Sequence, residues 1–259
     1  MTTMDWNRTK TIFIVTFLLL NVYLTWQLVE TNNANQMSLI KEVTIQEMLS
    51  ENNVTIDVEL PEVEILSPLI VGKHVPFEEG ELLTNGQLIE MEEDYAIQSI
   101  LEEPFFLSEE QFFEDLIQFL SSYVYKGMDY RFGGYELETQ SLYLYQAYED
   151  YTAYTFDDEP LRLYLNDDRE VVSYEQRYFE FEEQQDNEPE MLSSLKAIEK
   201  LWSDQLIGMN DTITDVQFGY YSFFSPAGDV QVFAPMWRVT VEEEIYLVHA
   251  INSSVQHLT

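Results

Sequence analysis

The 259-residue sequence contains no cysteine, and only 12 lysine and arginine residues stand against 48 aspartate and glutamate residues. Without cysteine the chain forms no disulfide, thiolate zinc site, cysteine nucleophile or lipidated cysteine. The net charge of −36 excludes nucleic acids as partners, because phosphate recognition needs clustered cations, and it disfavours attachment to anionic lipids. The acidic residues are dispersed in pairs and triplets, which favours a solvated surface suited to salty or alkaline surroundings over a single cation trap.

Glycine and proline are scarce as well, at 9 and 8 residues, whereas hydrophobic residues make up 46% of the chain and aromatic residues 14%. This balance excludes collagen-like, low-complexity and disordered proteins. At roughly 100–200 residues per domain, the length predicts one or two domains with a substantial core.

One segment has no charged residue, and it covers residues 11–29, TIFIVTFLLLNVYLTWQLV. A helix of this length spans about 28 Å, close to the roughly 30 Å hydrocarbon core of a bilayer. Arg8 and Lys10 precede the segment and Glu30 follows it, so the positive-inside rule predicts an uncleaved signal anchor with a cytoplasmic N-terminus. A cleaved signal peptide and a buried helix of a soluble protein are the alternatives. The segment is longer than the usual signal-peptide core, and no A-x-A cleavage pattern follows it.

The predicted anchor carries a strongly polar residue, Asn21, near its middle. Phe17, Asn21 and Thr25 follow one another at four-residue spacing and therefore share one face of a helix. An amide in hydrocarbon gains from a partner, and interhelical hydrogen bonds in membranes are worth about 0.6–2 kcal/mol. We predict that these three residues contact a partner transmembrane helix. The alternative is that Asn21 bonds its own backbone or reaches water.

Beyond the anchor, three successive portions each begin with a helical pattern and continue with strand patterns. In the first, apolar residues over 35–50 have a helical spacing continuous with the anchor. Strict alternation over residues 54–60 predicts a half-buried strand, and residues 63–71 are its expected partner. The other signals of this portion are turns at Glu79-Gly80 and Asn85-Gly86 and a strand near residues 96–101.

The second portion opens with Ser108, which forms a capping box with Gln111 three residues later and predicts a helix start. Gly127 is expected to close this helix. Its broad apolar face consists of Phe112, Phe113, Leu116, Phe119, Leu120 and Tyr123. Tyrosine-rich strands are predicted over residues 142–148, 161–165 and 170–181, with Asn166-Asp167-Asp168 as the turn between the last two.

The third portion repeats this order. Asn187 is expected to cap a helix with Pro189 and Glu190 in its first turn. The buried stripe of this helix consists of Leu192, Leu195, Ile198, Leu201 and Trp202. Strands are predicted over residues 214–224, 230–238 and 239–251, with residues 225–229 as the first turn.

These patterns predict an α+β fold. An N-terminal transmembrane helix is followed by extracellular modules, each a helix with an antiparallel β-meander, packed as an elongated ectodomain. The predicted division is a cytoplasmic tail (1–10), a transmembrane signal anchor (11–29), a linker helix with a first α+β portion (30–107), a middle helix plus antiparallel sheet (108–185) and a C-terminal helix plus antiparallel sheet (186–259).

Motifs for catalysis and cofactor binding are missing from the sequence, which has no P-loop, dinucleotide fingerprint, nucleophile elbow or HExxH pair. The histidines lack metal-ligand spacing; they are His74, His249 and His257. The pairs Asp157-Asp158 and Asp167-Asp168 lack the alternating ligands and the glycine of a calcium loop. Many acidic residues always offer candidates for a glycosidase pair, yet nothing selects one. We therefore predict a non-enzyme without catalytic, cofactor-binding or metal-binding residues.

Tyrosines gather at the start of the second set of strands, at positions 143, 145, 148, 151 and 154. Such residues usually pack as cross-strand pairs on a sheet face. The alternative is a stacking surface for sugars, which makes the chain a membrane-anchored module for a cell-wall polymer or carbohydrate. An anchored hydrolase is a third alternative.

Several segments have the order and spacing of one family. They are residues 4–14 (MDWNRTKTIFI), 174–179 (YEQRYF), 218–221 (FGYY), 235–239 (PMWRV) and 246–252 (YLVHAIN). Together they cover nearly the whole chain, and the sequence resembles the YycI family, also called WalI. Two departures concern the last turn, because His249 stands where the family more often has asparagine and Ser253 replaces the usual glycine.

The resemblance implies regulation rather than catalysis. Proteins of this family lie beside YycH in the membrane of low-GC Gram-positive bacteria. They associate with the sensor histidine kinase YycG (WalK) of an essential two-component system that controls cell-wall metabolism, partly through transmembrane helices. For this sequence the resemblance implies a single-pass membrane protein with an extracellular C-terminal domain and with YycG and YycH as partners.

Overall fold

The structure, a computed structural model, describes residues 6–63, 69–78, 80, 82–83, 86–92, 95–155, 160–184, 191–222 and 230–258. The chain divides into two compact units, Met1–Thr55 and Ile56–Thr259. Strand β1 (Thr55–Ile56) lies at the boundary in the sequence. The finer division of the ectodomain at residues 107 and 185 stays a prediction.

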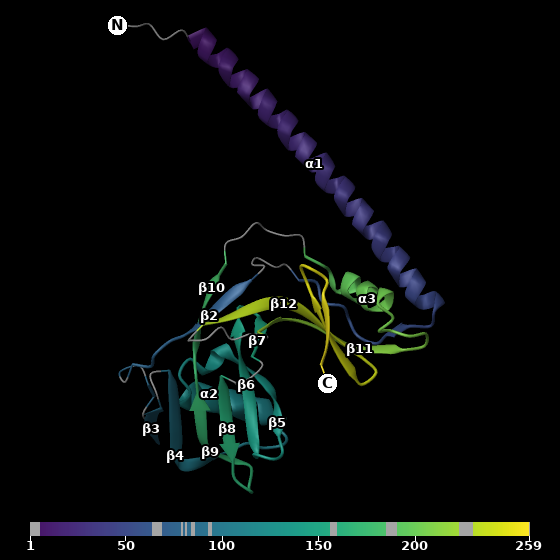
Figure 1. Ribbon diagram of the computed structural model, residues 1–259. Coiled ribbons are helices and arrows are strands. Elements are labelled where there is room, and N and C mark those ends of the chain that lie inside the picture. The colour runs from purple at the N-terminus through teal and green to yellow at the C-terminus, as the bar shows by residue number, and fades with distance from the viewer. Residues whose placement is uncertain are drawn as a thin grey trace, which may run out of the picture. The chain divides into compact units, whose positions relative to one another are not determined.

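The first unit is dominated by one long helix, α1 (Trp6–Glu51), which is drawn in purple and blue in Figure 1. The helix runs unbroken through residues 35–50, which confirms the predicted continuity with the preceding apolar segment. It ends where Asn53 adopts a left-handed conformation, with φ of +57°. The Val54 N–H then donates to the Leu49 carbonyl oxygen at 2.9 Å, which satisfies one of the carbonyls left over at the helix end.

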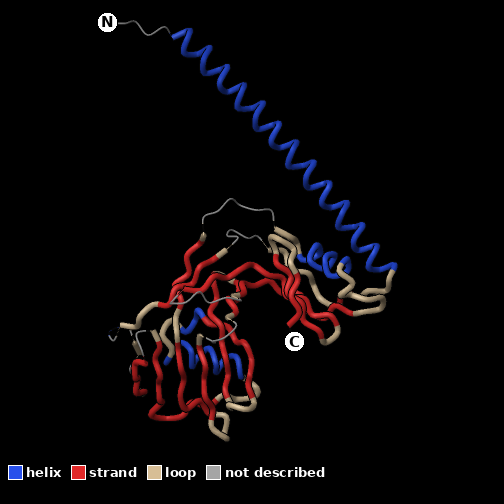
Figure 2. The backbone as a smooth tube through the Cα atoms, in the orientation of Figure 1, coloured by secondary structure: helices blue, strands red, loops and turns tan. Residues whose placement is uncertain are grey.

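The second unit is a mixed α+β structure dominated by one large sheet (Figures 1 and 2). Its helices are α2 (Phe112–Tyr123), η2 (Gly127–Asp129, a 3₁₀ turn) and α3 (Ser194–Ser203). Its strands are β2 (Ile70–His74), β3 (Gln87–Glu92), β4 (Ala96–Phe106), β5 (Tyr130–Glu136), β6 (Ser141–Tyr148), β7 (Tyr151–Tyr154), β8 (Leu161–Leu165), β9 (Glu170–Gln176), β10 (Phe179–Glu183), β11 (Thr212–Tyr221), β12 (Val230–Val241), β13 (Glu244–His249) and β14 (Val255–Leu258).

The strand order along the main path is β10-β2-β12-β11-β7-β6-β8-β9-β4-β3, and β5 and β13 pair beside it with β6 and β12. Apart from the parallel pair β7 and β11, the strand pairs with a described register are antiparallel. The α+β class and the antiparallel sheet are thus confirmed. Because β7 pairs with both β6 and β11, the strands of the middle and C-terminal portions form one continuous surface.

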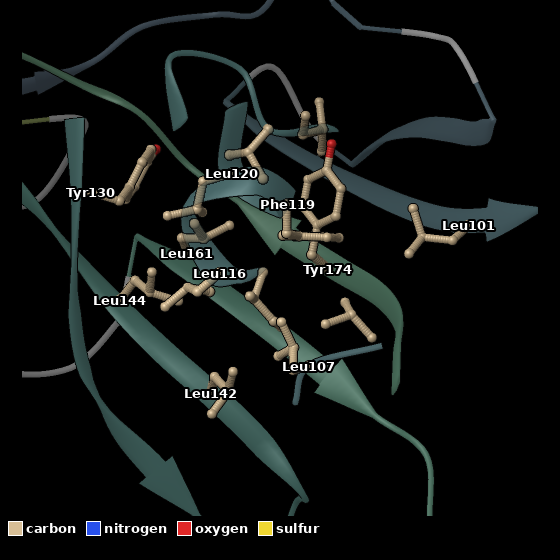
Figure 3. Close-up of a cluster of buried hydrophobic side chains, with 14 residues drawn as sticks. Leu101, Leu107, Leu116, Phe119, Leu120, Tyr130, Leu142, Leu144, Leu161 and Tyr174 are labelled. Atoms are coloured by element: carbon tan, nitrogen blue, oxygen red, sulfur yellow. The ribbon is translucent and has the colours of Figure 1, made fainter. Parts of the chain in front are cut away.

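Helix α2 packs its apolar face onto the middle part of the sheet (Figure 3). Leu116, Phe119 and Leu120 are buried there among strand residues such as Leu161 and Tyr174. The Phe119 ring meets the Tyr174 ring edge-on, with 6.1 Å between the ring centroids. Phe113, in contrast, is 61% exposed, so this member of the predicted apolar face does not pack into the core. The apolar arc of α2 is therefore narrower than its sequence suggested.

The start of α2 uses Ser108 differently from the predicted capping box. The Ser108 hydroxyl accepts a hydrogen bond from the Gln111 N–H at 3.0 Å, but the α-helix begins only at Phe112. The returning bond comes from Asp115, whose carboxylate accepts the Ser108 N–H at 2.8 Å. These bonds to Ser108 lower the pKa of Asp115, because they stabilise its charged form.

Gly127 closes the turn that follows α2. The helix ends at Tyr123, and Gly127 lies in the 3₁₀ turn η2, where it is buried. A Cβ atom at this position would overlap the carbonyl oxygen of Leu120. Glycine is therefore required by the close approach of the turn to the helix end.

Helix α3 begins later than predicted. It starts at Ser194, with Ser193 as N-cap accepting the Lys196 N–H at 3.3 Å, whereas residues 185–190 lie outside the described residues. The predicted start at Asn187 is thus wrong, because Ser193 supplies the cap. The stripe of Leu195, Ile198 and Leu201 is buried as expected. Leu192 precedes the helix, and its carbonyl oxygen accepts the indole N–H of Trp237 at 2.8 Å.

Two strand boundaries differ from the predictions. The expected break after Arg238 is wrong, because β12 runs through it and the turn lies at Glu242, which has φ of +55°. The expected single strand over residues 170–181 divides after Gln176 into β9 and β10. The division has a tertiary cause, because β9 pairs with β4 and β8 whereas β10 pairs with β2.

The predicted pairing of residues 54–60 with 63–71 is not seen among the described residues, and residues 64–68 lie outside them. Strand β2 begins at Ile70 and pairs with β10 and β12. The Asp57 N–H donates instead to the Ile213 carbonyl oxygen, at 2.9 Å.

Strands at 142–148 and 161–165 and the turn at 166–168 are confirmed, and so is the strand near 96–101, which is longer than expected. Strands β3, β5, β7 and β14 were not predicted, and residues 225–229 lie outside the described residues.

Candidate partner and ligand surfaces

Helix α1 exposes a belt of large apolar side chains over residues 12–26. Phe17 is 63% exposed and Leu18 is 59% exposed. The other members are Ile12, Phe13, Ile14, Val15, Leu19, Leu20, Val22, Tyr23, Leu24 and Trp26. None of the helices in the described part of the chain combines the length and the hydropathy of a membrane-spanning segment. The signal anchor at residues 11–29 and the topology derived from it therefore stay predictions.

The three predicted contact residues of the belt form a ladder of bonds within their own helix. The Asn21 side-chain amide donates to the Phe17 carbonyl oxygen at 2.8 Å. The Thr25 hydroxyl donates to the Asn21 carbonyl oxygen at the same distance. An Asn side chain has two donor hydrogens and an acceptor oxygen, so this bond uses one part of its capacity. The single chain therefore shows Asn21 bonded to its own backbone, and the partner contact stays a prediction.

The tyrosine-rich segment separates into two groups, because successive side chains of a strand point to opposite faces. Tyr143 and Tyr145 of β6 lie together with Tyr154 of β7, with 5.9 Å between the first two ring centroids and 5.0 Å between the last two. Tyr221 of β11 stacks on Tyr154 at 4.5 Å. The fold thus brings three of the five predicted tyrosines together and adds a fourth from a distant strand.

The other two tyrosines of the segment have structural contacts elsewhere. The Tyr148 hydroxyl donates to a carboxylate oxygen of Glu183 at 2.7 Å. The Tyr151 ring meets the Phe218 ring edge-on at 5.0 Å. These two residues follow the expected pattern of packing across a sheet.

Glycines on neighbouring strands make room for the tyrosine rings. A Cβ atom on Gly133 of β5 would lie 2.7 Å from ring carbons of both Tyr143 and Tyr145. A Cβ atom on Gly219 of β11 would lie 3.0 Å from the Tyr154 ring. Glycine inside a strand marks a close approach of this kind, so the Gly-Gly pair at 133–134 was the available sequence signal.

A cavity of about 530 Å³ opens beside these rings, within the roughly 300–1,000 Å³ range of small-molecule sites. We call it the tyrosine pocket. Its walls come from β5, β6, β7, β11, β12, β13 and β14 and the residues that follow them. The lining residues are Phe132, Gly133, Tyr143, Tyr145, Tyr154, Thr155, Gln217, Tyr221, Ser222, Arg238, Ile245 and Leu258.

The charged group in the lining of the tyrosine pocket is neutralised by a neighbour. The Arg238 guanidinium donates to a carboxylate oxygen of Asp215 at 2.8 Å, and the Gln217 amide donates to the other oxygen at 3.3 Å. Burial, with the neighbouring Tyr154, raises the pKa of Tyr221 well above its usual value. The tyrosine pocket therefore presents hydroxyls, an amide and a paired guanidinium.

A second, more apolar groove of about 440 Å³ lies between the start of α2 and strand β5. Its wall includes Phe112, Phe132 and Tyr135, and also Leu137, which is 80% exposed. Phe113 extends the patch, since its ring meets the Phe132 ring edge-on at 5.9 Å. Exposed apolar patches of this kind mark contact surfaces. We call it the α2–β5 patch; the helical periodicity that placed Phe113 in the core concealed it.

The three histidines have separate roles in the fold. His249 accepts the Ile251 N–H on its Nδ1 atom at 3.1 Å, and burial lowers the pKa of this histidine. His257 bonds the carboxylate of Glu244, and the ring of His74 in β2 packs against the Phe179 ring, with 4.1 Å between the ring centroids.

The acidic pairs form no cation site in the described residues. Asp168 belongs to a turn in which its N–H donates to the Asn166 side chain at 3.0 Å. Asp157 and Asp158 lie outside the described residues. Within the described residues, no group of three or more histidine, aspartate or glutamate side chains is arranged to hold a metal ion.

Comparison with known proteins places these features in a family. The family model described as "YycI protein" matches residues 33–251, which include the segments at 174–179, 218–221 and 235–239. No curated protein matches the chain. Among solved structures, the chain is similar to an uncharacterized protein from Eubacterium rectale ATCC 33656, at 11% identity and a TM-score of 0.39, with 79% of this chain and 86% of that chain covered. Because the family match spans far more than half of its length, the chain belongs to the YycI family.

Proposed function

We propose that the protein is a non-enzymatic regulator of the sensor histidine kinase YycG (WalK), anchored in the membrane by a single helix and acting in complex with YycH. The observation that carries the proposal is the family match over residues 33–251. The YycI family is a regulatory family rather than a family of enzymes, and its association with the YycG system supports the kinase as a partner.

The apolar belt of α1 supports the membrane anchor. Its side chains from Ile12 to Trp26 are exposed, although apolar surface of this extent is normally covered. A bilayer provides that cover, and Arg8 and Lys10 ahead of the belt favour a cytoplasmic N-terminus. The second unit then lies outside the cell, where its acidic surface is solvated.

Asn21 supports contact with a partner helix in the membrane. Its amide bonds the Phe17 carbonyl oxygen, yet a side chain with two donor hydrogens and an acceptor oxygen can also bond a neighbouring helix. Phe17 and Thr25 lie on the same face and supply van der Waals contact beside it. A kinase transmembrane helix is the proposed neighbour.

The α2–β5 patch supports a second contact, outside the membrane. Phe113 and Leu137 expose apolar area that water solvates poorly, and they flank strand β5, which pairs with β6. Contacts with both partners allow regulation only if the complex binds two kinase states unequally, and a coupling of about 1–3 kcal/mol is sufficient.

Co-purification from native membranes tests the proposal. The tagged full-length chain is compared with a variant in which residues 11–29 are replaced by an unrelated transmembrane helix, and recovered proteins are identified by mass spectrometry. We expect the kinase and YycH with the native anchor and a loss of the kinase with the replaced anchor. Recovery of both proteins with either anchor moves the kinase contact to the ectodomain. Absence of the kinase from both samples rejects the proposal.

A further inference from the structure

We infer that the tyrosine pocket is a binding site for a short neutral saccharide. This inference stands on the geometry of the second unit and goes beyond the proposed kinase regulation. A saccharide offers two kinds of surface, a face of C–H groups that stacks on aromatic rings and a rim of hydroxyls that forms hydrogen bonds. The tyrosine pocket presents a partner for each.

The aromatic walls of the tyrosine pocket face in different directions. The planes of Tyr143 and Tyr145 meet at 74°, and those of Tyr145 and Tyr154 meet at 58°. A sugar ring that stacks on one tyrosine therefore also contacts the edge or face of the neighbouring tyrosine. Phe132 of β5 also lines the cavity. Rigid aromatic walls supply contact area with little loss of conformational entropy on binding.

The polar groups of the tyrosine pocket converge from three segments. Gln217 and Arg238 lie on β11 and β12, and Thr155 and Ser222 follow β7 and β11. The amide and hydroxyl groups donate and accept hydrogen bonds, as sugar hydroxyls do, and the guanidinium donates them. A pocket with apolar walls and a few convergent polar groups is the usual form of a small-molecule site.

Charge selects a neutral ligand over an ionic one. An anionic ligand is repelled by a chain with a net charge of −36, and the positive charge of Arg238 is already compensated by Asp215 at 2.8 Å. A cationic ligand finds no partner of opposite charge, because none of the described lining residues carries a carboxylate. The same aromatic walls therefore suit an uncharged polyol best.

The tyrosine pocket is built into the backbone rather than left by loose packing. Gly133 and Gly219 permit the close seating of the rings, and Tyr221 is buried beneath Tyr154. Tyr154 and Tyr221 reach the site because β7 and β11 run parallel, with Tyr154 opposite Tyr221 in the register. The cavity beside them remains open at about 530 Å³, whereas rings that serve packing alone fill such a volume.

Calorimetric titration of the full-length chain in detergent micelles tests the inference, with N,N′-diacetylchitobiose and maltose as probes. We expect saturable binding of at least one sugar. Tyr145→Ala removes a wall, and we expect about threefold to tenfold weaker binding, the range of an aromatic contact. Tyr148→Ala is the matched control, because Tyr148 lies on the same strand but contacts Glu183 and Phe181 outside the tyrosine pocket. Its affinity is expected to match that of the wild type.

A second variant covers the case in which Tyr145→Ala does not fold. Gln217→Leu keeps the size of an exposed side chain but removes its amide, so we expect weaker binding with cooperative unfolding retained. Absence of saturable binding of both sugars, equal weakening by Tyr145→Ala and Tyr148→Ala, or binding of choline in place of the sugars overturns the inference. Recovery of the kinase from membranes is unaffected by these outcomes, so failure of this site and failure of the regulatory proposal are distinguished.

Discussion

The apolar belt of α1 and the core beneath α2 are built from the same residue types, yet their surroundings are opposite. Leu18 in the belt is 59% exposed, whereas Leu163 in β8 is fully buried. In the second unit, the strands and helix α2 pack against one another around a cluster of leucines and aromatic rings. The difference teaches that an apolar run alone does not predict a hydrophobic core. It predicts only that its side chains need to be shielded from water, by the protein itself or by its surroundings.

In the two regions, different surroundings shield the apolar side chains from water. Burial of a large apolar side chain is worth roughly 1.5–3 kcal/mol, and in the second unit folding itself provides that stabilisation. The apolar side chains of the belt from Ile12 to Trp26 remain exposed in the single chain. Under the proposed function, a bilayer and partner helices shield them from water. The comparison leads to predictions that separate folding from association.

Phe119→Ala and Phe17→Ala apply one chemical change to the two regions. Phe119 is fully buried, so its truncation leaves a cavity and is expected to lower the free energy of unfolding by about 3–5 kcal/mol. Phe17 is exposed, so its truncation is expected to leave the unfolding of the second unit unchanged. Denaturant unfolding of the full-length chain in micelles, followed by near-ultraviolet circular dichroism of the tyrosines, measures both. Similar losses in the two variants contradict the comparison.

Gly127→Ala tests the tight turn that holds α2 against the sheet. The added methyl group overlaps the Leu120 carbonyl oxygen, so a loss of about 1–3 kcal/mol is expected from the forced displacement. Gly80→Ala is the control, because no described atom would lie within 4 Å of its Cβ atom. The same unfolding measurement compares them. A neutral Gly127→Ala variant shows that the turn moves aside.

Asn21→Leu tests the belt for association rather than folding. Removal of an interhelical hydrogen bond in a membrane is expected to weaken kinase association by about 0.6–2 kcal/mol, which is roughly threefold to thirtyfold. Thr16→Val is the matched control, because Thr16 bonds the Ile12 carbonyl oxygen from a different face of the same helix. Quantified co-purification is the measurement, and the unfolding of the second unit is expected to be unchanged. Equal kinase recovery with Asn21→Leu and with the wild type removes Asn21 from the contact.

His249→Asn tests the smallest effect, a pH dependence in the C-terminal hairpin. Burial lowers the pKa of His249 in the folded chain, so the unfolded chain binds a proton more readily. Stability is therefore expected to fall as the pH drops through the unfolded value of about 6.5 and to stay constant above it. Protonation also removes the Nδ1 acceptor of the Ile251 N–H.

The measurement for His249 is the melting temperature of the wild type and of His249→Asn between about pH 7.5 and pH 5.5. Asparagine keeps an acceptor oxygen but does not titrate, so the variant is expected to lose less stability over this range. The carboxylates titrate alike in both chains and cancel in the difference. Parallel curves contradict the assignment of this pH dependence to His249.

Local patterns in the sequence predicted much of the fold. The buried stripe of Leu195, Ile198 and Leu201 and the strands at 142–148 and 161–165 follow from periodicity alone, because one face of each element is buried. The predictions were wrong where contacts with segments distant in the sequence determine the structure. Strand β10 separates from β9 in order to pair with β2, and Phe113 is exposed although its spacing fits the apolar face.

The candidate surfaces divide in the same way. The sequence located the apolar belt and the tyrosine-rich segment, since both are local features of composition. It did not indicate that Tyr221 and Arg238 join Tyr143, Tyr145 and Tyr154, because that depends on the pairing of β7 with β11. Alternation along β6 determines which of its tyrosines share a face of the sheet. Which other strands contribute side chains to that face depends on long-range strand pairing.

By itself, the sequence determined the acidic surface, the absence of cysteine chemistry, the apolar N-terminal segment, the alternation of helices with antiparallel strands and the resemblance that the family match confirms. These properties follow from residue type and local spacing. Only the tertiary structure decided which strands pair, which tyrosines line a cavity and which apolar side chains stay exposed. The physical reason is that pairing between distant segments is selected by the combined packing of many side chains, and no single segment contains that information.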